Sequence, residues 1–307
     1  MIGYIVRRVL YTIPPPSLFG FLVAFFSLPR LSGDPTLLFL PIDAPEEARQ
    51  AFRVQQGLDR PLIEQFVTFT YKAVQGDFGK SLRFFEPVSS LLFERVGATL
   101  QLALATLLIA VSIGIPAGIV AAYYQNSSFD VSVRGAAALG HAVPTFYWGV
   151  ISILVFAVWL KWLPTGGAGS LAHLVLPATT LASGLIALLT RVMRSTVLDV
   201  MRQDFVRTAR AKGLSEFAVV MRHVVRNALI PILTVIALEF GALMGGVIVT
   251  ETVFSWPGIG RLLIQAIYAR DYAIVQAVVF FFAIVFVLSN LVADILATVA
   301  DPRVRYR

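Results

Sequence analysis

Six apolar runs in this 307-residue chain constrain its fold more than any other feature. A membrane-spanning helix needs about 20 mostly apolar residues. Charged residues make up 14% of the chain, against about 25% in ordinary soluble domains. We therefore predict an all-α membrane protein with six transmembrane helices, at about residues 9–28, 99–123, 136–160, 174–190, 228–249 and 273–298.

Several function classes find no support in the residues. The chain has no cysteine, and its three histidines show no metal-ligand spacing, so we predict no metal site. Gly79-Lys80-Ser81 lacks the upstream glycine of a phosphate loop, because position 74 is Val. No catalytic constellation is evident, and we predict no enzymatic activity. The net charge of +7 is spread over loops, which predicts contact with membrane lipid and no nucleic-acid partner.

The distribution of Lys and Arg predicts the orientation. The short loops on one side carry most of the basic residues, including Arg7, Arg8, Arg134 and those at 191–226. Basic short loops stay in the cytoplasm, whereas long segments cross largely regardless of charge. We therefore expect both termini in the cytoplasm, and an uncleaved first helix within residues 1–29.

Residues 30–98 form a 69-residue segment that we expect outside the cytoplasm. It holds Gly57-Leu58-Asp59-Arg60-Pro61 and Gly76-Asp77-Phe78-Gly79, which predict turns between short helices. The remaining residues, 99–307, would form a five-helix core. Prolines inside the apolar runs, among them Pro144, predict kinks.

A basic segment at 198–226 separates two of the predicted spans. Phe217, Val220, Met221, Val224 and Val225 follow the spacing of one face of an α-helix. Ser215 is a candidate N-cap, and Gly213 would permit a sharp left-handed turn before it. A weaker stripe precedes that turn and consists of Leu198, Met201, Phe205 and Ala209. Periodicity alone leaves open a helix that lies on the membrane surface with its arginines on lipid phosphates.

The order of residues in this segment resembles the coupling motif of ABC importer permeases. Arg207-Thr208-Ala209-Arg210-Ala211-Lys212-Gly213-Leu214-Ser215 and Arg226-Asn227-Ala228-Leu229-Ile230-Pro231 are similar to the dipeptide, oligopeptide and nickel branch of that family. Arg207 and Thr208 replace the Glu-Ala that begins the motif in the wider superfamily. Further landmarks in family order are Gly33-Asp34-Pro35, Glu251-Thr252-Val253-Phe254-Ser255-Trp256-Pro257-Gly258, Arg270-Asp271-Tyr272 and Asp301-Pro302-Arg303.

The resemblance implies a type I ABC importer (MetI-like) transmembrane domain in a bacterial or archaeal cytoplasmic membrane. It implies a second homologous permease, two cytoplasmic ATPase subunits and an extracytoplasmic solute-binding protein as partners. ATP and Mg would then bind to the ATPases, and this chain would hold no cofactor. The substrates implied are di- or oligopeptides, then glutathione-like or opine-like compounds, then chelated nickel.

By the same resemblance, residues take separate roles. Those expected to contact the ATPase are Thr208, Ala209, Arg210, Ala211, Gly213, Leu214, Ser215, Phe217, Met221 and Arg222. Those expected to dock the binding protein are Asp77, Glu251 and Asp271.

Glu239 stands in the middle of the fifth apolar run, followed by Gly245 and Gly246. A charge near the bilayer centre costs about 2.5–3.5 kcal/mol on insertion scales, so it needs a reason. Glu239 either faces the translocation path, with the glycines leaving room for a solute, or makes a buried polar contact. An intramembrane acid also suits an ion-coupled secondary transporter, which is the alternative function. A structural membrane scaffold would explain the helices but not the order of the motifs.

Overall fold

The computed structural model describes residues 25, 36–41 and 43–300, and every regular element in this part of the chain is helical. The predicted span at 9–28 therefore lies, except for Phe25, outside the described residues. The elements are α3 Thr36–Phe39, α4 Glu46–Gln55, α5 Leu62–Val74, α6 Val88–Tyr123, α7 Ser128–Ala142, α8 Thr145–Ser152, the π-helix η1 Ile153–Trp159, α9 Leu171–Met201, α10 Asp204–Ala211, α11 Glu216–Ala218, the π-helix η2 Val219–Val225, α12 Arg226–Val253, α13 Ile259–Tyr268 and α14 Tyr272–Ala300.

Within the described residues, four helical stretches are long and apolar enough to cross a membrane: α6, α9, η2 continued by α12, and α14. The bent pair of α7 with α8 and η1 would make a fifth. The helix that contains the second predicted span begins at Val88, upstream of residue 99, and its first turns include Leu91 and Leu92, which are both buried. The predicted end of the polar segment at residue 98 therefore falls inside this helix.

Two helix pairs form most of the core, α6 against α9 and α12 against α14. Both pairs approach closely at glycines. A Cβ at Gly118 of α6 would lie 2.7 Å from the Cβ of Met193 on α9, and one at Gly241 of α12 would lie 2.9 Å from the Cβ of Ser289 on α14. Small residues at such crossings are the usual means of packing helices in a membrane.

The third predicted span is broken at Pro144, as its sequence indicates. The helices on either side meet at 97°. A buried ion pair fixes the first half to α9, because Nε and Nη2 of Arg194 donate to the Asp130 carboxylate at 2.6 and 2.7 Å. The backbone N–H of Asn126 also donates to Asp130, at 2.9 Å.

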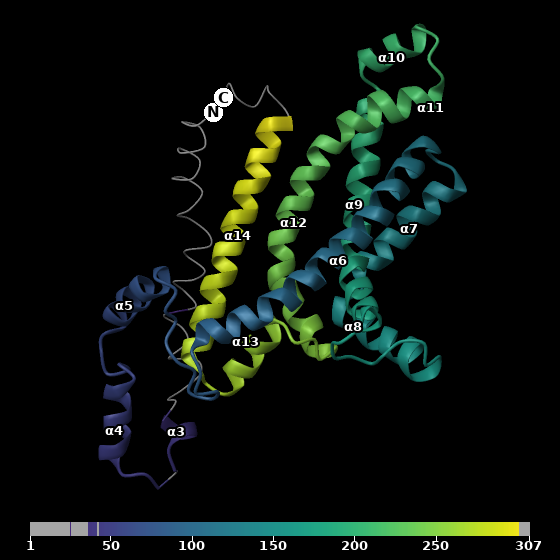
Figure 1. Cartoon of the computed structure of the whole chain (residues 1–307). Helices are drawn as coiled ribbons and strands as arrows, with labels where there is room; N and C mark the ends of the chain where they lie inside the picture. The colour runs from purple at the N-terminus through teal and green to yellow at the C-terminus, as the bar shows by residue number, and fades with distance from the viewer. Residues whose placement is uncertain (1–24, 26–35, 42, 301–307) are drawn as a thin grey trace.

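The two ends of the helix bundle differ in construction (Figure 1). At one end α10 and α11 project beyond α9 and α12. At the other end the short helix α13 joins α12 to α14, and α3 to α5 lie on that side. The turns predicted there are present, since Gly57 and Gly76 have φ of 68° and 82°.

Candidate coupling surface and translocation path

The segment between α9 and α12 turns sharply at Gly213. Its φ is +79°, the left-handed conformation that the sequence predicts at this position. The N–H of Gly213 donates to the carbonyl of Arg210 at 2.9 Å and so ends α10. Ser215 then caps the next helix, accepting a hydrogen bond from the N–H of Ala218 at 3.4 Å. The predicted helix, turn and helix are confirmed.

An ion pair that the sequence analysis did not predict closes this turn. Arg210 donates from Nε and Nη2 to the two carboxylate oxygens of Glu216, at 3.0 and 2.6 Å. The Glu216 carboxylate raises the pKa of the Arg210 guanidinium, through these hydrogen bonds and its charge. Arg210 was predicted to contact the ATPase, which stays a prediction, and its guanidinium also holds the turn together. The sequence signal that could have predicted this ion pair is the acid six residues after the arginine, on the other side of the glycine turn.

The predicted apolar stripe is divided in the structure because residues Val219–Val225 form a π-helix, whose bonds join residues five apart. Val219, Val220, Val224 and Val225 are buried, at a spacing that repeats every five residues. Phe217 and Met221, assigned to the same stripe by α-helical spacing, lie on the outside. The stripe is thus partly wrong, and the π-helix is the physical reason.

Three large apolar side chains are exposed around the turn. Leu214, Phe217 and Met221 are 43, 73 and 45% exposed. Ala211, Ser215 and Arg222 are also exposed and border them. We call Leu214, Phe217 and Met221 the exposed apolar face.

Thr208 and Ala209, which were also predicted to contact the ATPase, differ in exposure. Ala209 is buried against the core, so it is not open to a partner in this structure. Thr208 is exposed and its hydroxyl donates to the carbonyl of Asp204 at 3.1 Å, and its contact with a partner stays a prediction.

One hydrophobic cluster connects the segment to the membrane helices. It includes Val206 and Ala209 of α10, the four buried valines of η2, and Leu189 and Met193 of α9. It continues into α12 through Ala228 and Ile232. Interiors packed in this way transmit displacement instead of absorbing it. A movement of the exposed apolar face would therefore be passed to α9 and α12.

Glu239 lies half-buried on α12 and has no hydrogen bond or ion pair among the described residues. Its place on the path and the alternative of a buried polar contact both stay predictions. Leu238, Ala242 and Gly245 of the same helix are exposed, and a Cβ at Gly245 would meet no atom within 4 Å. Gly246 follows in the same helix, but its surroundings lie outside the described residues.

Two of the three acids expected to dock a binding protein are fully buried in this chain. Glu251 accepts hydrogen bonds from the Thr99 hydroxyl at 2.7 Å and from the N–H of Arg261 at 3.0 Å. Asp271 accepts from the Ser81 hydroxyl at 2.6 Å. Neither is open to a partner in this structure, so this prediction is corrected.

Asp77, the third of these acids, is exposed. It accepts a hydrogen bond from the N–H of Gly79 at 2.9 Å. The structure therefore leaves Asp77 as the single accessible member of the predicted docking set.

The described residues contain no group of three or more His, Asp or Glu side chains arranged to hold a metal ion.

Comparisons with known proteins agree with this architecture. The family described as "Binding-protein-dependent transport system inner membrane component" matches residues 114–306. The glutathione transport system permease protein GsiC of Escherichia coli strain K12 is 42% identical over 307 residues, which is 100% of both chains. The protein of that name in Shigella dysenteriae serotype 1 has the same identity and coverage.

Solved structures share the fold at lower identity. An inward-facing MetNI methionine ABC transporter matches 70% of this chain and 99% of its own, with a TM-score of 0.61 and 18% identity. An amino acid ABC transporter solved with histidines matches 70% of this chain and 94% of its own, with a TM-score of 0.50 and 16% identity.

The helices, the projecting segment and these likenesses define a class, the permease subunits of ABC transporters. This chain belongs to the family of binding-protein-dependent transport system inner membrane components, within its peptide and nickel importer branch. It is a multi-pass inner membrane protein and a translocation component, not a catalytic one.

Proposed function

We propose that this chain is one half of the translocation unit of an ATP-driven importer for small peptides and related solutes, glutathione among them. The carrying observation is the exposed apolar face on a segment packed into the core of α9 and α12. An exposed apolar patch that polar residues surround marks a site of contact with a partner. The occupant that suits this family is a cytoplasmic ATPase subunit.

The mechanism follows from the packing. Burial of Leu214, Phe217 and Met221 in a groove of the ATPase would contribute about 1.5–3 kcal/mol for each side chain fully covered. ATP and Mg bind between the ATPase subunits and draw them together, and the hydrophobic cluster passes that displacement into α9 and α12. A second, homologous permease completes the path, which opens alternately to each side of the membrane. In this scheme both termini and the exposed apolar face lie in the cytoplasm.

Substrate choice involves Glu239. Its carboxylate lacks a partner among the described residues, and it shares α12 with the open position at Gly245. We infer that it meets the cationic amino group of a peptide, since an acid at this depth needs a compensating charge. Glu239→Gln should reduce uptake of peptides with a free N-terminus more than uptake of N-acetylated ones. Equal uptake of both by the variant and the wild type would refute this role.

The proposal as a whole is tested by isolating the tagged chain in a mild detergent and identifying what accompanies it by mass spectrometry. We expect an ATPase and a second permease, together with ATP-dependent peptide uptake after reconstitution with a binding protein. Recovery of the chain alone, active in liposomes with an ion gradient and no ATP, would instead establish the ion-coupled carrier.

A further inference from the structure

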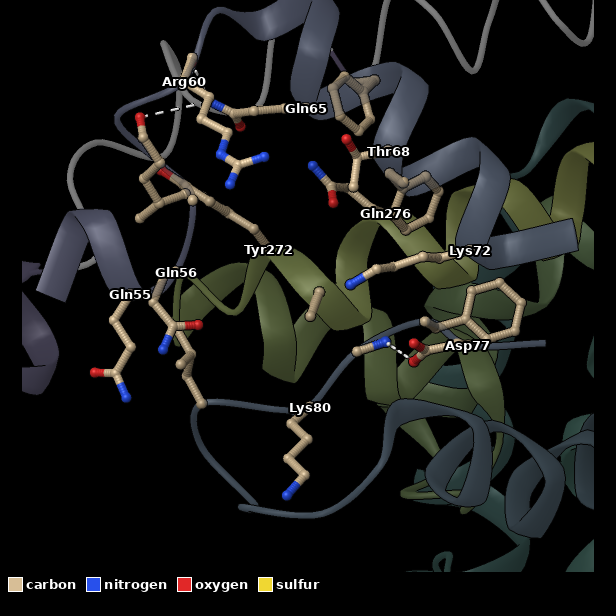
Figure 2. A pocket seen from close by; sticks show the side chains of 18 of the residues that line it. Gln55, Gln56, Arg60, Gln65, Thr68, Lys72, Asp77, Lys80, Tyr272 and Gln276 are labelled. Carbon is tan, nitrogen blue, oxygen red and sulfur yellow. Dashed lines mark hydrogen bonds between the residues drawn. The ribbon is translucent and has the colours of Figure 1, made fainter. Parts of the chain in front are cut away.

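A cavity of about 360 Å³ lies at the end of the bundle opposite the exposed apolar face. It is bounded by α5, the turn at residues 76–82 and the first turns of α14 (Figure 2). This volume is within the range of about 300–1,000 Å³ that is usual for small-molecule sites. The function proposed above leaves this cavity without a role.

The cavity gathers positive charge from separate parts of the chain. Arg60, Lys72 and Lys80 line it, and Asp77 is the one carboxylate among its lining residues. Among the described residues, neither lysine has a hydrogen bond or ion pair, whereas Arg60 is paired with Glu64 at 3.1 Å. The two lysines therefore leave uncompensated charge at the site.

Amide groups accompany these cations. Lys72 and Thr68 of α5 and Gln276 of α14 all line the cavity (Figure 2). Gln56 and Gln65 also line it. Gln65 donates to the Arg60 carbonyl at 2.8 Å, which leaves its own amide oxygen available as an acceptor. The lining thus offers ammonium groups for an anion, and amide donors and acceptors beside them.

Helix α5 has its polarity reversed relative to a surface helix in water. Gln65, Thr68 and Lys72 face the cavity. On the opposite face Ile63, Val67, Tyr71 and Val74 are all more than half exposed. α5 therefore presents two distinct surfaces, an apolar one to the outside and a polar one to the cavity.

We propose that this cavity is an extracytoplasmic site for the carboxylate end of a small peptide, separate from the path beside Glu239. The ammonium group of Lys72 binds the carboxylate, Lys80 adds positive charge at the edge of the cavity, and the glutamine amides bond the peptide groups that follow it. The site rests on the proposed function, and it would collect solute at the outer surface of the permease before or after release from a binding protein.

The same cationic groups would accept the phosphate of an anionic lipid headgroup, so the test separates the two sources. The purified full chain is placed in phosphatidylcholine nanodiscs, and glutathione, which carries two carboxylates and two peptide-type amides, is titrated by calorimetry. Glutathione diethyl ester, with both carboxylates blocked and its ammonium group retained, is the probe that lacks carboxylates. Parallel nanodiscs of phosphatidylglycerol supply the lipid competitor, and mass spectrometry under native conditions detects retained lipid.

Three variants give effects of different sign. Lys72→Gln with Lys80→Gln should weaken glutathione binding at least about tenfold, because two cations near a carboxylate are lost. Asp77→Asn should tighten it about threefold, since the repelling charge is removed while the amide oxygen still accepts from the N–H of Gly79. Lys161→Gln, at an exposed lysine outside the cavity, should change nothing.

The site would be established if glutathione binds and its ester does not, and if affinity falls in the double variant, rises in Asp77→Asn and is unchanged in Lys161→Gln. Equal binding by the wild type and the double variant would overturn it. Phosphatidylglycerol retained by the wild type and lost from the double variant, without glutathione binding, would also overturn it and assign the cavity to lipid. ATP-dependent uptake by the reconstituted importer is measured in parallel. Its absence would count against the proposed function, whereas uptake that persists without cavity binding would count against this site alone.

Discussion

Gly213→Val isolates the contribution of one backbone conformation to coupling. Gly213 has φ of +79°, and a Cβ built there would meet no atom within 4 Å. The substitution therefore introduces no clash, and its cost is conformational. A residue with a Cβ in the left-handed region costs about 1–2 kcal/mol, and a β-branched one lies at the upper end.

That cost should appear in transport and not in overall folding. A free-energy change of about 1–2 kcal/mol lowers the population of the native turn about 5- to 30-fold relative to its alternatives. The hydrophobic cluster below, from Val206 to Ile232, keeps its contacts because Gly213 is outside it. We expect the exposed apolar face to be displaced, with fewer solute molecules transported for each ATP hydrolysed.

The assay is reconstitution of the complete importer in liposomes, with solute uptake and phosphate release measured on the same samples. Gly167→Val is the matched control, because Gly167 has φ of +90° and a Cβ there would meet only the His173 ring at 3.9 Å, but it lies in the loop before α9. Both variants should lose similar stability in a thermal melt. Only Gly213→Val should reduce the ratio of uptake to hydrolysis, and an unchanged ratio would refute the coupling role of this turn.

Three further substitutions test contacts described above. Arg210→Lys removes the paired hydrogen bonds to Glu216, whose side chains are about 40% exposed, so we expect a stability loss of at most about 1 kcal/mol in a thermal melt. Coupled uptake should fall clearly, and unchanged uptake would mean that this ion pair is dispensable. Asp130→Ala removes a fully buried carboxylate and leaves Arg194, whose side chain is 17% exposed, without this partner, so it should cost up to about 3–5 kcal/mol. The midpoint of thermal unfolding in detergent measures this, and a shift as small as that of an exposed ion pair would contradict it. Gly258→Ala places a Cβ against the Glu251 carboxylate and should cost about 1–3 kcal/mol, whereas Gly97→Ala, with no atom within 4 Å, should be tolerated in the same melt.

Local rules predicted the features that depend on a few neighbouring residues. The turn at Gly213, the cap at Ser215 and the break at Pro144 are each decided by backbone chemistry within a few positions. The apolar runs predicted the long helices for the same reason, since about 20 apolar residues cross a bilayer whatever their partners.

Features set by tertiary contacts were not predictable in this way. The stripe through Phe217 and Met221 assumed an α-helical period, and no residue in it signals the π-helix that divides it. From the sequence, Glu251 and Asp271 were placed on the surface because loops are usually polar. Their burial depends on Thr99 and Ser81, which are more than 150 residues away in the chain. A buried carboxylate is stabilised by its hydrogen-bond donors. Here those donors are far away in the sequence, so the sequence alone did not indicate the burial.

The hydrogen bonds of Glu251 and Asp271 affect which helices can move together when the exposed apolar face is displaced. Glu251 joins α12 to the Thr99 hydroxyl on α6, and Asp271 joins the start of α14 to Ser81 ahead of α6. At the opposite end, the hydrophobic cluster joins η2 and α12 to α9, which lies along α6. α6 and α12 are therefore connected at both ends, by the hydrogen bond between Thr99 and Glu251 at one end and through the hydrophobic cluster at the other. A displacement imposed on the exposed apolar face should then tilt these helices together, and that tilt is the kind of movement by which a path can open on one side as it closes on the other.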